Sequence, residues 1–118
     1  MGYENDPYAL GNVLRRVNKE LGEKGIKKTL IVTENGIATD DDEKRRVFIG
    51  KALEGLRDAK DEGVEVKGYF HWSLLDNFEW QKGFAMTFGL IAVDRSNMER
   101  HPKESLYYLG SFAPEDKV

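Results

Sequence analysis

A single glutamate stands close to the end of a short apolar run. Glu34 comes two residues after the run 29–32 (Thr-Leu-Ile-Val), and Asn35-Gly36 follows it directly. The run predicts a strand, and the Asn-Gly pair predicts where that strand ends. In parallel α/β folds the carboxyl ends of the strands form the edge at which ligands bind and catalysis occurs. Glu34 is therefore a candidate catalytic carboxylate, with a solvated or capping role as the alternative.

A second stretch, residues 69–80, mixes aromatic rings with carboxylate and amide groups. Trp72 and Trp80 lie eight positions apart, with Asp76 and Glu79 between them. Aromatic faces stack on the C–H face of a pyranose ring, and carboxylates accept hydrogen bonds from its hydroxyl groups. This combination favours a carbohydrate-binding site. The alternative is a small aromatic core beneath a loop.

Composition narrows the class of protein. The chain has 118 residues, a formal net charge of −3, 40% hydrophobic residues, 33% charged residues and no cysteine. These proportions are typical of a soluble globular chain that forms one small domain or part of a larger one. Without cysteine there is no disulfide framework and no thiolate nucleophile. The negative net charge excludes binding to nucleic acid by bulk electrostatics, which requires a strongly basic surface.

Several shorter signals predict ordinary solvated structure. Lys44-Arg45-Arg46 is expected to form an exposed helical turn rather than a nucleic-acid patch. His71 and His101 lack the spacing of metal ligands, so neither a metal nor another cofactor is expected. The apolar runs are far shorter than the roughly 20 residues that span a bilayer, so we expect no membrane partner. The first six residues are acidic and polar rather than a secretory signal, which favours a cytoplasmic protein.

Helical and strand patterns alternate along the chain. Asp6-Pro7 is a suitable helix start, and Asp40 with Glu43 has capping-box spacing before the clearest helix. The buried stripe of that helix is expected to be Phe48, Ile49, Ala52, Leu53, Leu56 and Ala59. The predicted elements are a helix over 6–22, a strand over 29–32 buried on both faces, a helix over 40–63, a strand from 64 to about 73, a long loop over 74–101 and a helix from Pro102 to about 112.

This alternation indicates βαβ units and a parallel sheet, and therefore an α/β fold. Residues 1–118 are expected to form one segment, with a polar tail from about residue 114. Two parallel strands alone cannot make a sheet whose faces and edges are all covered. The pattern is therefore that of a slice of a larger α/β protein.

Three motifs in order resemble glycoside hydrolase family 1, the β-glucosidases and 6-phospho-β-glycosidases. The first motif is residues 31–36 (Ile-Val-Thr-Glu-Asn-Gly). The second is residues 68–80 (Gly-Tyr-Phe-His-Trp-Ser-Leu-Leu-Asp-Asn-Phe-Glu-Trp). The third is residues 88–91 (Phe-Gly-Leu-Ile), followed by Val93-Asp94. The resemblance covers essentially the whole chain and implies a (β/α)₈ TIM barrel.

The same resemblance implies a retaining mechanism and assigns roles to five residues. Glu34 matches the nucleophile of the family's Thr-Glu-Asn-Gly motif. Trp72 matches the tryptophan that lines the sugar subsite. Glu79 matches the glutamate that binds the distal hydroxyls of the glycone, beside the indole N–H of Trp80. Phe88 matches an aromatic residue next to the same subsite.

One part of the family's machinery is missing. The acid/base of the family lies in an Asn-Glu-Pro motif on the fourth strand, and that motif does not occur in these 118 residues. The resemblance therefore implies the last quarter of a barrel, with its seventh and eighth strands. The stretch after the eighth strand lacks the Ser and Lys that hold a phosphate in the 6-phospho enzymes, which favours an unphosphorylated β-glucoside or related sugar.

Two other functions remain open from the sequence. The chain could be a catalytically inactive barrel fragment that associates with itself or with a complementing barrel chain, because its strands have uncovered edges. It could also be a sugar-binding module that uses Trp72 and Trp80 without the nucleophile. For the isolated chain, we expect weak or no turnover on ordinary glycosides.

Overall fold

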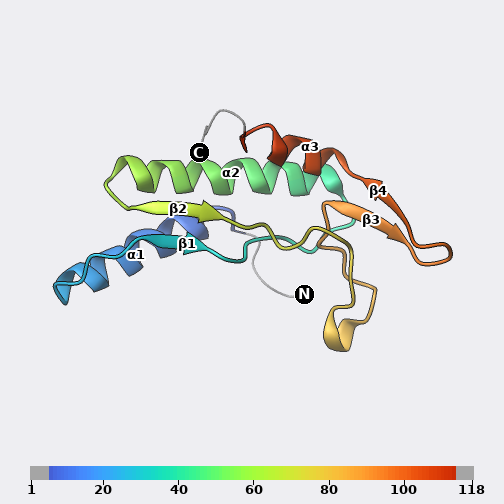
Figure 1. The fold of residues 1–118 in the computed structure, drawn as a ribbon, viewed down its shortest axis with the longest axis horizontal. Helices are drawn as coiled ribbons and strands as arrows, with labels where there is room; N and C mark the ends of the chain where they lie inside the picture. The colour runs from blue at the N-terminus through green and yellow to red at the C-terminus, as the bar shows by residue number, and fades with distance from the viewer. Residues whose placement is uncertain (1–5, 114–118) are drawn as a thin grey trace.

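The computed structural model describes residues 6–113 (Figure 1). Residues 1–5 and the polar tail predicted from about residue 114 lie outside the described residues. The elements are α1 (Ala9–Glu23), β1 (Leu30–Val32), α2 (Asp42–Asp61), β2 (Val66–Tyr69), the short 3₁₀ helix η1 (Trp80–Lys82), β3 (Ile91–Asp94), β4 (Glu99–Pro102) and α3 (Glu104–Gly110). Within 6–113, no helix has the length and apolarity to cross a membrane.

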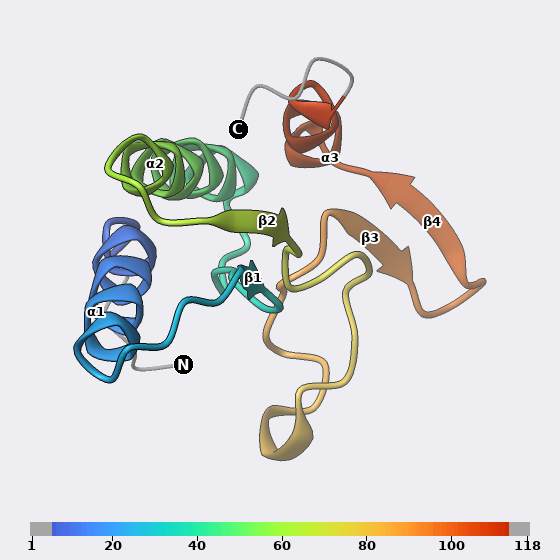
Figure 2. The same cartoon turned by 60° about the vertical axis from the view of Figure 1, so that its left-hand side comes forward.

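The two strands β1 and β2 form the parallel pair that the alternating pattern predicts. Leu30 lies opposite Val66 and Val32 lies opposite Tyr69, with α2 as the crossover between the strands. Figure 2 shows α1 and α2 on one side of this pair. A single cluster of buried side chains joins the helices to the strands; it contains Leu14, Val32, Leu56, Ala59, Val64 and Val66. This βαβ unit confirms the predicted α/β class.

Helix α2 carries the predicted stripe, and all six residues of that stripe are buried. The stripe lies against α1, β2 and α3, so this helix is the centre of the described structure. Its contact with α1 is close because two glycines face each other. A Cβ atom at Gly11 would lie 2.9 Å from the carbonyl oxygen of Gly55. The sequence analysis did not single out either glycine, because glycine contributes nothing to the periodic pattern of apolar residues.

The prediction that β1 is buried on both faces is wrong. Val32 is buried toward the helices, but Ile31 is 56% exposed on the opposite face. The side chain of Ile31 lies beside Gly68 of β2, and Phe70 lies on the same face and is also exposed. The reason is that helices cover only one face of this two-stranded sheet within 6–113.

The predicted loop over 74–101 contains an antiparallel hairpin. Ile91 pairs with Pro102 and Asp94 pairs with Glu99 across β3 and β4. Strand β4 is exposed along its length, so its sequence carries no alternation of apolar and polar residues that could reveal it. Pro102 therefore ends a strand instead of starting the last helix, which begins at Glu104.

The remaining boundaries shift by a few residues. The cap of α2 is Asp41 rather than Asp40, and its side chain accepts the backbone N–H groups of Glu43 and Lys44. Asp6 accepts the backbone N–H of Tyr8, but α1 begins only at Ala9. The strand predicted from 64 to about 73 narrows to β2. Phe70 still donates its N–H to Val32 of β1, but the backbone N–H groups of Trp72 and Ser73 donate to segments outside the named strands.

Candidate active site

Glu34 lies just beyond the end of β1, and its side chain is exposed. The backbone on both sides of it is fixed to the segment that follows β2. Phe70 donates its N–H to the carbonyl oxygen of Val32 (2.9 Å), and Trp72 donates to that of Asn35 (2.9 Å). The carboxyl ends of β1 and β2 therefore continue side by side, and Glu34 emerges at the edge where parallel α/β proteins place their sites.

Gly36 allows the chain to pass unusually close to Trp72. A Cβ atom at Gly36 would lie 1.9 Å from the carbonyl oxygen of Trp72. The peptide bond between Trp72 and Ser73 is cis. Asn35-Gly36 is a turn signal in the sequence, but it forms no tight turn here, and Gly36 does not adopt a positive φ. Glycine is required here by the lack of space beside its Cα atom.

Phe88 reaches the same region from a distant part of the chain. Its carbonyl oxygen accepts the N–H of Ser73 (3.1 Å), and Leu90 donates its N–H back to the carbonyl oxygen of Ser73 (2.9 Å). The ladder continues to a parallel bridge between Leu75 and Ile91. Three predicted site residues, Glu34, Trp72 and Phe88, are thus on backbone segments that are hydrogen-bonded to one another.

Glu79 and Trp80 lie on a separate projection. The turn around η1 is closed by a hydrogen bond from Glu79 N–H to the carbonyl oxygen of Gly83 (2.7 Å). The tip of this loop stands away from β1 and β2 in both views (Figures 1 and 2). Trp80 is 82% exposed. The base of the projection is held by an edge-to-face contact of Phe78 with Phe84, whose ring centroids are 5.4 Å apart.

A buried polar network supports the residues after Glu34. The hydroxyl of Tyr69 donates to Oδ1 of Asn35 (2.9 Å) and lies 3.5 Å from Nδ1 of His71. Burial raises the pKa of the Tyr69 hydroxyl, so it stays a neutral donor. Burial, with a smaller contribution from the charge of Arg45, lowers the pKa of His71 to about 4. His71 is therefore an uncharged, partly buried ring beside Tyr69 near neutral pH.

Arg45 contradicts the prediction of an exposed helical turn, because its side chain is fully buried. Its guanidinium donates to the carbonyl oxygens of Thr39 and Thr87 and to Oδ1 of Asp42. The guanidinium group thereby connects the segment after β1 to the segment before β3. The neighbours Lys44 and Arg46 are exposed as predicted. A single buried arginine within a basic run leaves no signal in the sequence.

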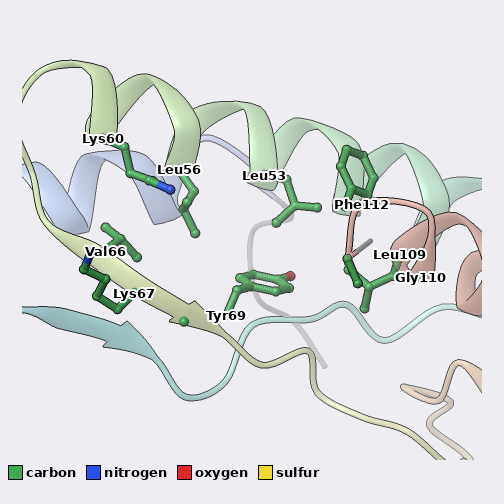
Figure 3. A pocket seen from close by; sticks show the side chains of 11 residues that line it. Leu53, Leu56, Lys60, Val66, Lys67, Tyr69, Leu109, Gly110 and Phe112 are labelled. Atoms are coloured by element: carbon green, nitrogen blue, oxygen red, sulfur yellow. The ribbon is translucent and has the colours of Figure 1, made fainter. Parts of the chain in front are cut away.

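A cavity of about 350 Å³ lies on the helix side of β2 (Figure 3). Leu53 and Leu56 of α2, Tyr69 of β2 and Phe112 after α3 are among its lining residues. No Asp or Glu is among those lining residues, so the cavity lacks the carboxylates that a sugar site uses. Within the described chain, no group of three or more His, Cys, Asp or Glu side chains is placed to hold a metal ion.

Comparison with known proteins identifies the family. The family model described as "Glycosyl hydrolase family 1" matches residues 1–118. Beta-glucosidase 42 of Arabidopsis thaliana is 38% identical over 122 residues, which cover 93% of this chain and 25% of that protein. The beta-galactosidase of Pyrococcus woesei is 51% identical over 73 residues, which cover 62% of this chain and 14% of that protein.

Solved structures agree with the sequence matches. The family 1 β-glucosidase from Thermotoga maritima has a TM-score of 0.87 and 36% identity over 95% of this chain and 27% of that one. It is also known in complex with glucoimidazole. These neighbours are TIM barrels, and the chain spans about a quarter of the length of the relatives it matches. The resemblance in the three motifs is confirmed: this chain belongs to glycosyl hydrolase family 1.

Proposed function

We propose that this chain acts in the retaining hydrolysis of β-glycosides and supplies the nucleophile, Glu34, with part of the glycone-binding surface. The observation that supports this most is the hydrogen bond from Trp72 N–H to the carbonyl oxygen of Asn35 (2.9 Å). It fixes the segment after Glu34 against the segment that carries the indole. A carboxylate at the carboxyl end of parallel strands can serve as the nucleophile of glycosyl transfer, and an aromatic face near it can stack on the sugar.

The reaction has two displacement steps. In the first, the Glu34 carboxylate forms a bond to the anomeric carbon while the bond from that carbon to the aglycone oxygen breaks. The departing oxygen takes a proton from a second carboxyl group, about 5–5.5 Å from the nucleophile in retaining enzymes. In the second step that group removes a proton from water, the water oxygen bonds to the anomeric carbon, and Glu34 is released as a carboxylate.

The second carboxyl group comes from outside these 118 residues in this proposal. The sequence has no Asn-Glu-Pro motif, where the family carries its acid/base. We assign β1 and β2 to the seventh and eighth strands of a TIM barrel whose other strands lie outside residues 1–118. The parallel pairing of the two strands and the 27% coverage of a related barrel chain support this assignment.

The proposed substrate is a β-glucoside or a related sugar. Trp72 and Phe88 provide aromatic faces next to Glu34, and Glu79 and Trp80 bind the distal glycone hydroxyls once the barrel is complete. The relatives include a beta-glucosidase and a beta-galactosidase, and a related β-glucosidase binds glucoimidazole. These names support a glycone of the glucose or galactose type.

Covalent labelling tests the assignment of Glu34. The chain is incubated with a 2-deoxy-2-fluoro-glucoside that has a dinitrophenyl leaving group, and its intact mass is measured. This leaving group departs without a proton, so the missing acid, which contributes about 10²–10⁴ in rate, is not needed for the first step. We expect a gain of one fluoroglucosyl unit, mapped by peptide sequencing to Glu34.

Glu34→Gln is the control for this experiment, because it keeps the size of the side chain but removes the nucleophile. Mass gained at another residue contradicts the assignment of Glu34. No gain of mass shows that the site of the isolated chain is incomplete or misfolded without the rest of the barrel. Glucoimidazole binding that survives Glu34→Gln but is lost in Trp80→Ala supports the sugar-binding module instead. Brisk hydrolysis of cellobiose by the isolated chain contradicts the proposal that an outside acid is needed.

One observation favours a second candidate function, association of copies of this chain. Ile31 and Phe70 are exposed on the uncovered face of the sheet, and β1 and β2 each pair on one edge within the described chain. Uncovered apolar faces and strand edges promote pairing with another chain. Light scattering during size-exclusion chromatography tests this candidate, and a monomer at all concentrations rejects it.

A further inference from the structure

An ion pair joins three segments at the base of the aromatic projection. Oδ1 of Asp76 accepts the ammonium group of Lys103 (3.0 Å) and the backbone N–H of Gly89 (2.8 Å). The same ammonium group donates to the carbonyl oxygen of Gly89 (2.8 Å). One carboxylate and one ammonium group thus hold both backbone polar groups of a single glycine.

The groups of this ion pair are closely packed and mostly buried. The side chains of Asp76 and Lys103 are each 16% exposed. A Cβ atom at Gly89 would lie 2.3 Å from the backbone nitrogen of Asp76, so the two segments touch. A charge-assisted pair with little access to water holds its geometry more firmly than an exposed pair does.

Two of the three segments carry candidate sugar-binding residues. Asp76 lies between Trp72 and the projection with Glu79, and Gly89 directly follows Phe88. We propose that Lys103 is a positioning residue that holds these two sugar-binding segments in register through Asp76 and Gly89. This inference rests on the proposed function for the part that concerns sugar affinity, while its structural part can be tested without sugar.

The role of Lys103 is separate from the docking of α3, which begins one residue later. Asp42 of α2 accepts the backbone N–H of Ser105 (2.9 Å) and its hydroxyl (2.7 Å). Ser105 is fully buried. The backbone N–H of Lys103 also donates to the carbonyl oxygen of Leu90 (2.9 Å). These bonds do not involve the ammonium group, so its removal leaves α3 anchored.

The test compares Lys103→Met with Lys103→Arg and with Lys19→Met as an exposed lysine control. The sugar-free measurement is amide hydrogen exchange at Gly89 and Ser105. In Lys103→Met we expect faster exchange at Gly89 and unchanged exchange at Ser105. In Lys19→Met we expect both amides to exchange as in the unmodified chain, and Lys103→Arg restores part of the protection at Gly89.

The second measurement separates binding from chemistry in the labelling of Glu34. In Lys103→Met we expect the sugar concentration for half-maximal labelling to rise about tenfold, with little change in the maximal rate constant, because misplaced binding groups weaken positioning before they alter the nucleophile. When Asp76→Asn is combined with Lys103→Met, the half-maximal sugar concentration should rise little further, since the two residues act through one interaction.

Three results overturn the inference. Unchanged Gly89 exchange in Lys103→Met shows that the ammonium group positions nothing. Loss of protection at Ser105 in that variant shows a general structural role. Unchanged half-maximal concentration with faster Gly89 exchange shows that the register does not serve sugar binding. If the unmodified chain is not labelled, the isolated chain does not form a working sugar site and the part of the inference that concerns sugar affinity fails, while Gly89 exchange still decides whether Lys103 positions the segments.

Discussion

The hydroxyl of Tyr69, at the end of β2, donates a hydrogen bond to Oδ1 of Asn35, the residue after Glu34. The two atoms are 2.9 Å apart. This side-chain bond joins the ends of the two strands, in parallel with the backbone bond from Trp72 to Asn35. Tyr69 was assigned to a strand from the sequence, but its link to the nucleophile segment spans 34 positions and leaves no local pattern.

Tyr69→Phe removes only the hydroxyl group. A net hydrogen bond contributes about 0.5–1.5 kcal/mol, and a buried acceptor left without its partner adds to the loss. We expect the free energy of unfolding in urea to fall by about 1 kcal/mol and the labelling of Glu34 to slow. Tyr107→Phe is the control, because Tyr107 is exposed on α3 and its loss should change neither quantity.

Gly36→Ala and Gly22→Ala should have opposite effects on stability. The new methyl group at Gly36 would overlap the carbonyl oxygen of Trp72, so we expect a loss of about 1–3 kcal/mol or more. Gly22 lies near the end of α1 with open space beside its Cα atom, and alanine there should stabilise the helix by about 0.5–1 kcal/mol. Urea unfolding of both variants checks this, and a stable Gly36→Ala chain contradicts the described contact.

Stability should fall in mild acid because of His71. Its pKa is about 4 in the folded chain and about 6.5 in the unfolded chain, so the unfolded chain binds more protons between these values. The free energy of unfolding is therefore highest above about pH 6.5 and decreases as the pH falls toward 4. His71→Asn should flatten this dependence of the free energy of unfolding on pH.

A second loss of stability is expected at lower pH from Asp42. Burial raises the pKa of its carboxyl group, but the hydrogen bonds from Ser105 and the ion pair with Arg45 outweigh burial and hold the pKa below its usual value. A carboxyl group with a lowered pKa stabilises the fold above its unfolded-state pKa, and that contribution is lost as the pH falls through the folded-state value. Asp42→Asn should remove this step from a pH titration of urea unfolding.

Arg45→Met should be far more damaging than Arg46→Met, although the residues are neighbours. Removing one side of a buried charged network costs about 3–5 kcal/mol, whereas exposed pairs contribute about 0–1 kcal/mol. Arg45 is fully buried, while Arg46 pairs with Glu43 at the surface. Thermal unfolding of the two variants measures the difference. Equal melting temperatures would show that the guanidinium of Arg45 does not hold the segments together.

The sequence predicts the buried face of an element well where apolar residues recur at regular spacing over many residues. The stripe of α2 repeats over twenty residues, so its buried face could be assigned residue by residue. The position of Glu34 just beyond β1 was predictable because a short apolar run followed by Asn-Gly marks the end of a strand. Strand β4 escaped prediction because it is exposed, and the pair Asp76–Lys103 escaped because 27 positions separate its members. Contacts that depend on three-dimensional proximity alone have no period to detect.

The capping of α3 by Asp42 has a consequence for the order of folding. Helix α3 has seven residues, too few to persist in water without tertiary contacts. Its N-cap residue, Lys103, makes no side-chain cap. The carboxylate that accepts the N–H of Ser105 instead belongs to Asp42 in the first turn of α2, 63 positions before Ser105. The formation of α3 therefore depends on the prior formation of α2. During synthesis or refolding, we expect α3 to be among the last elements to acquire structure.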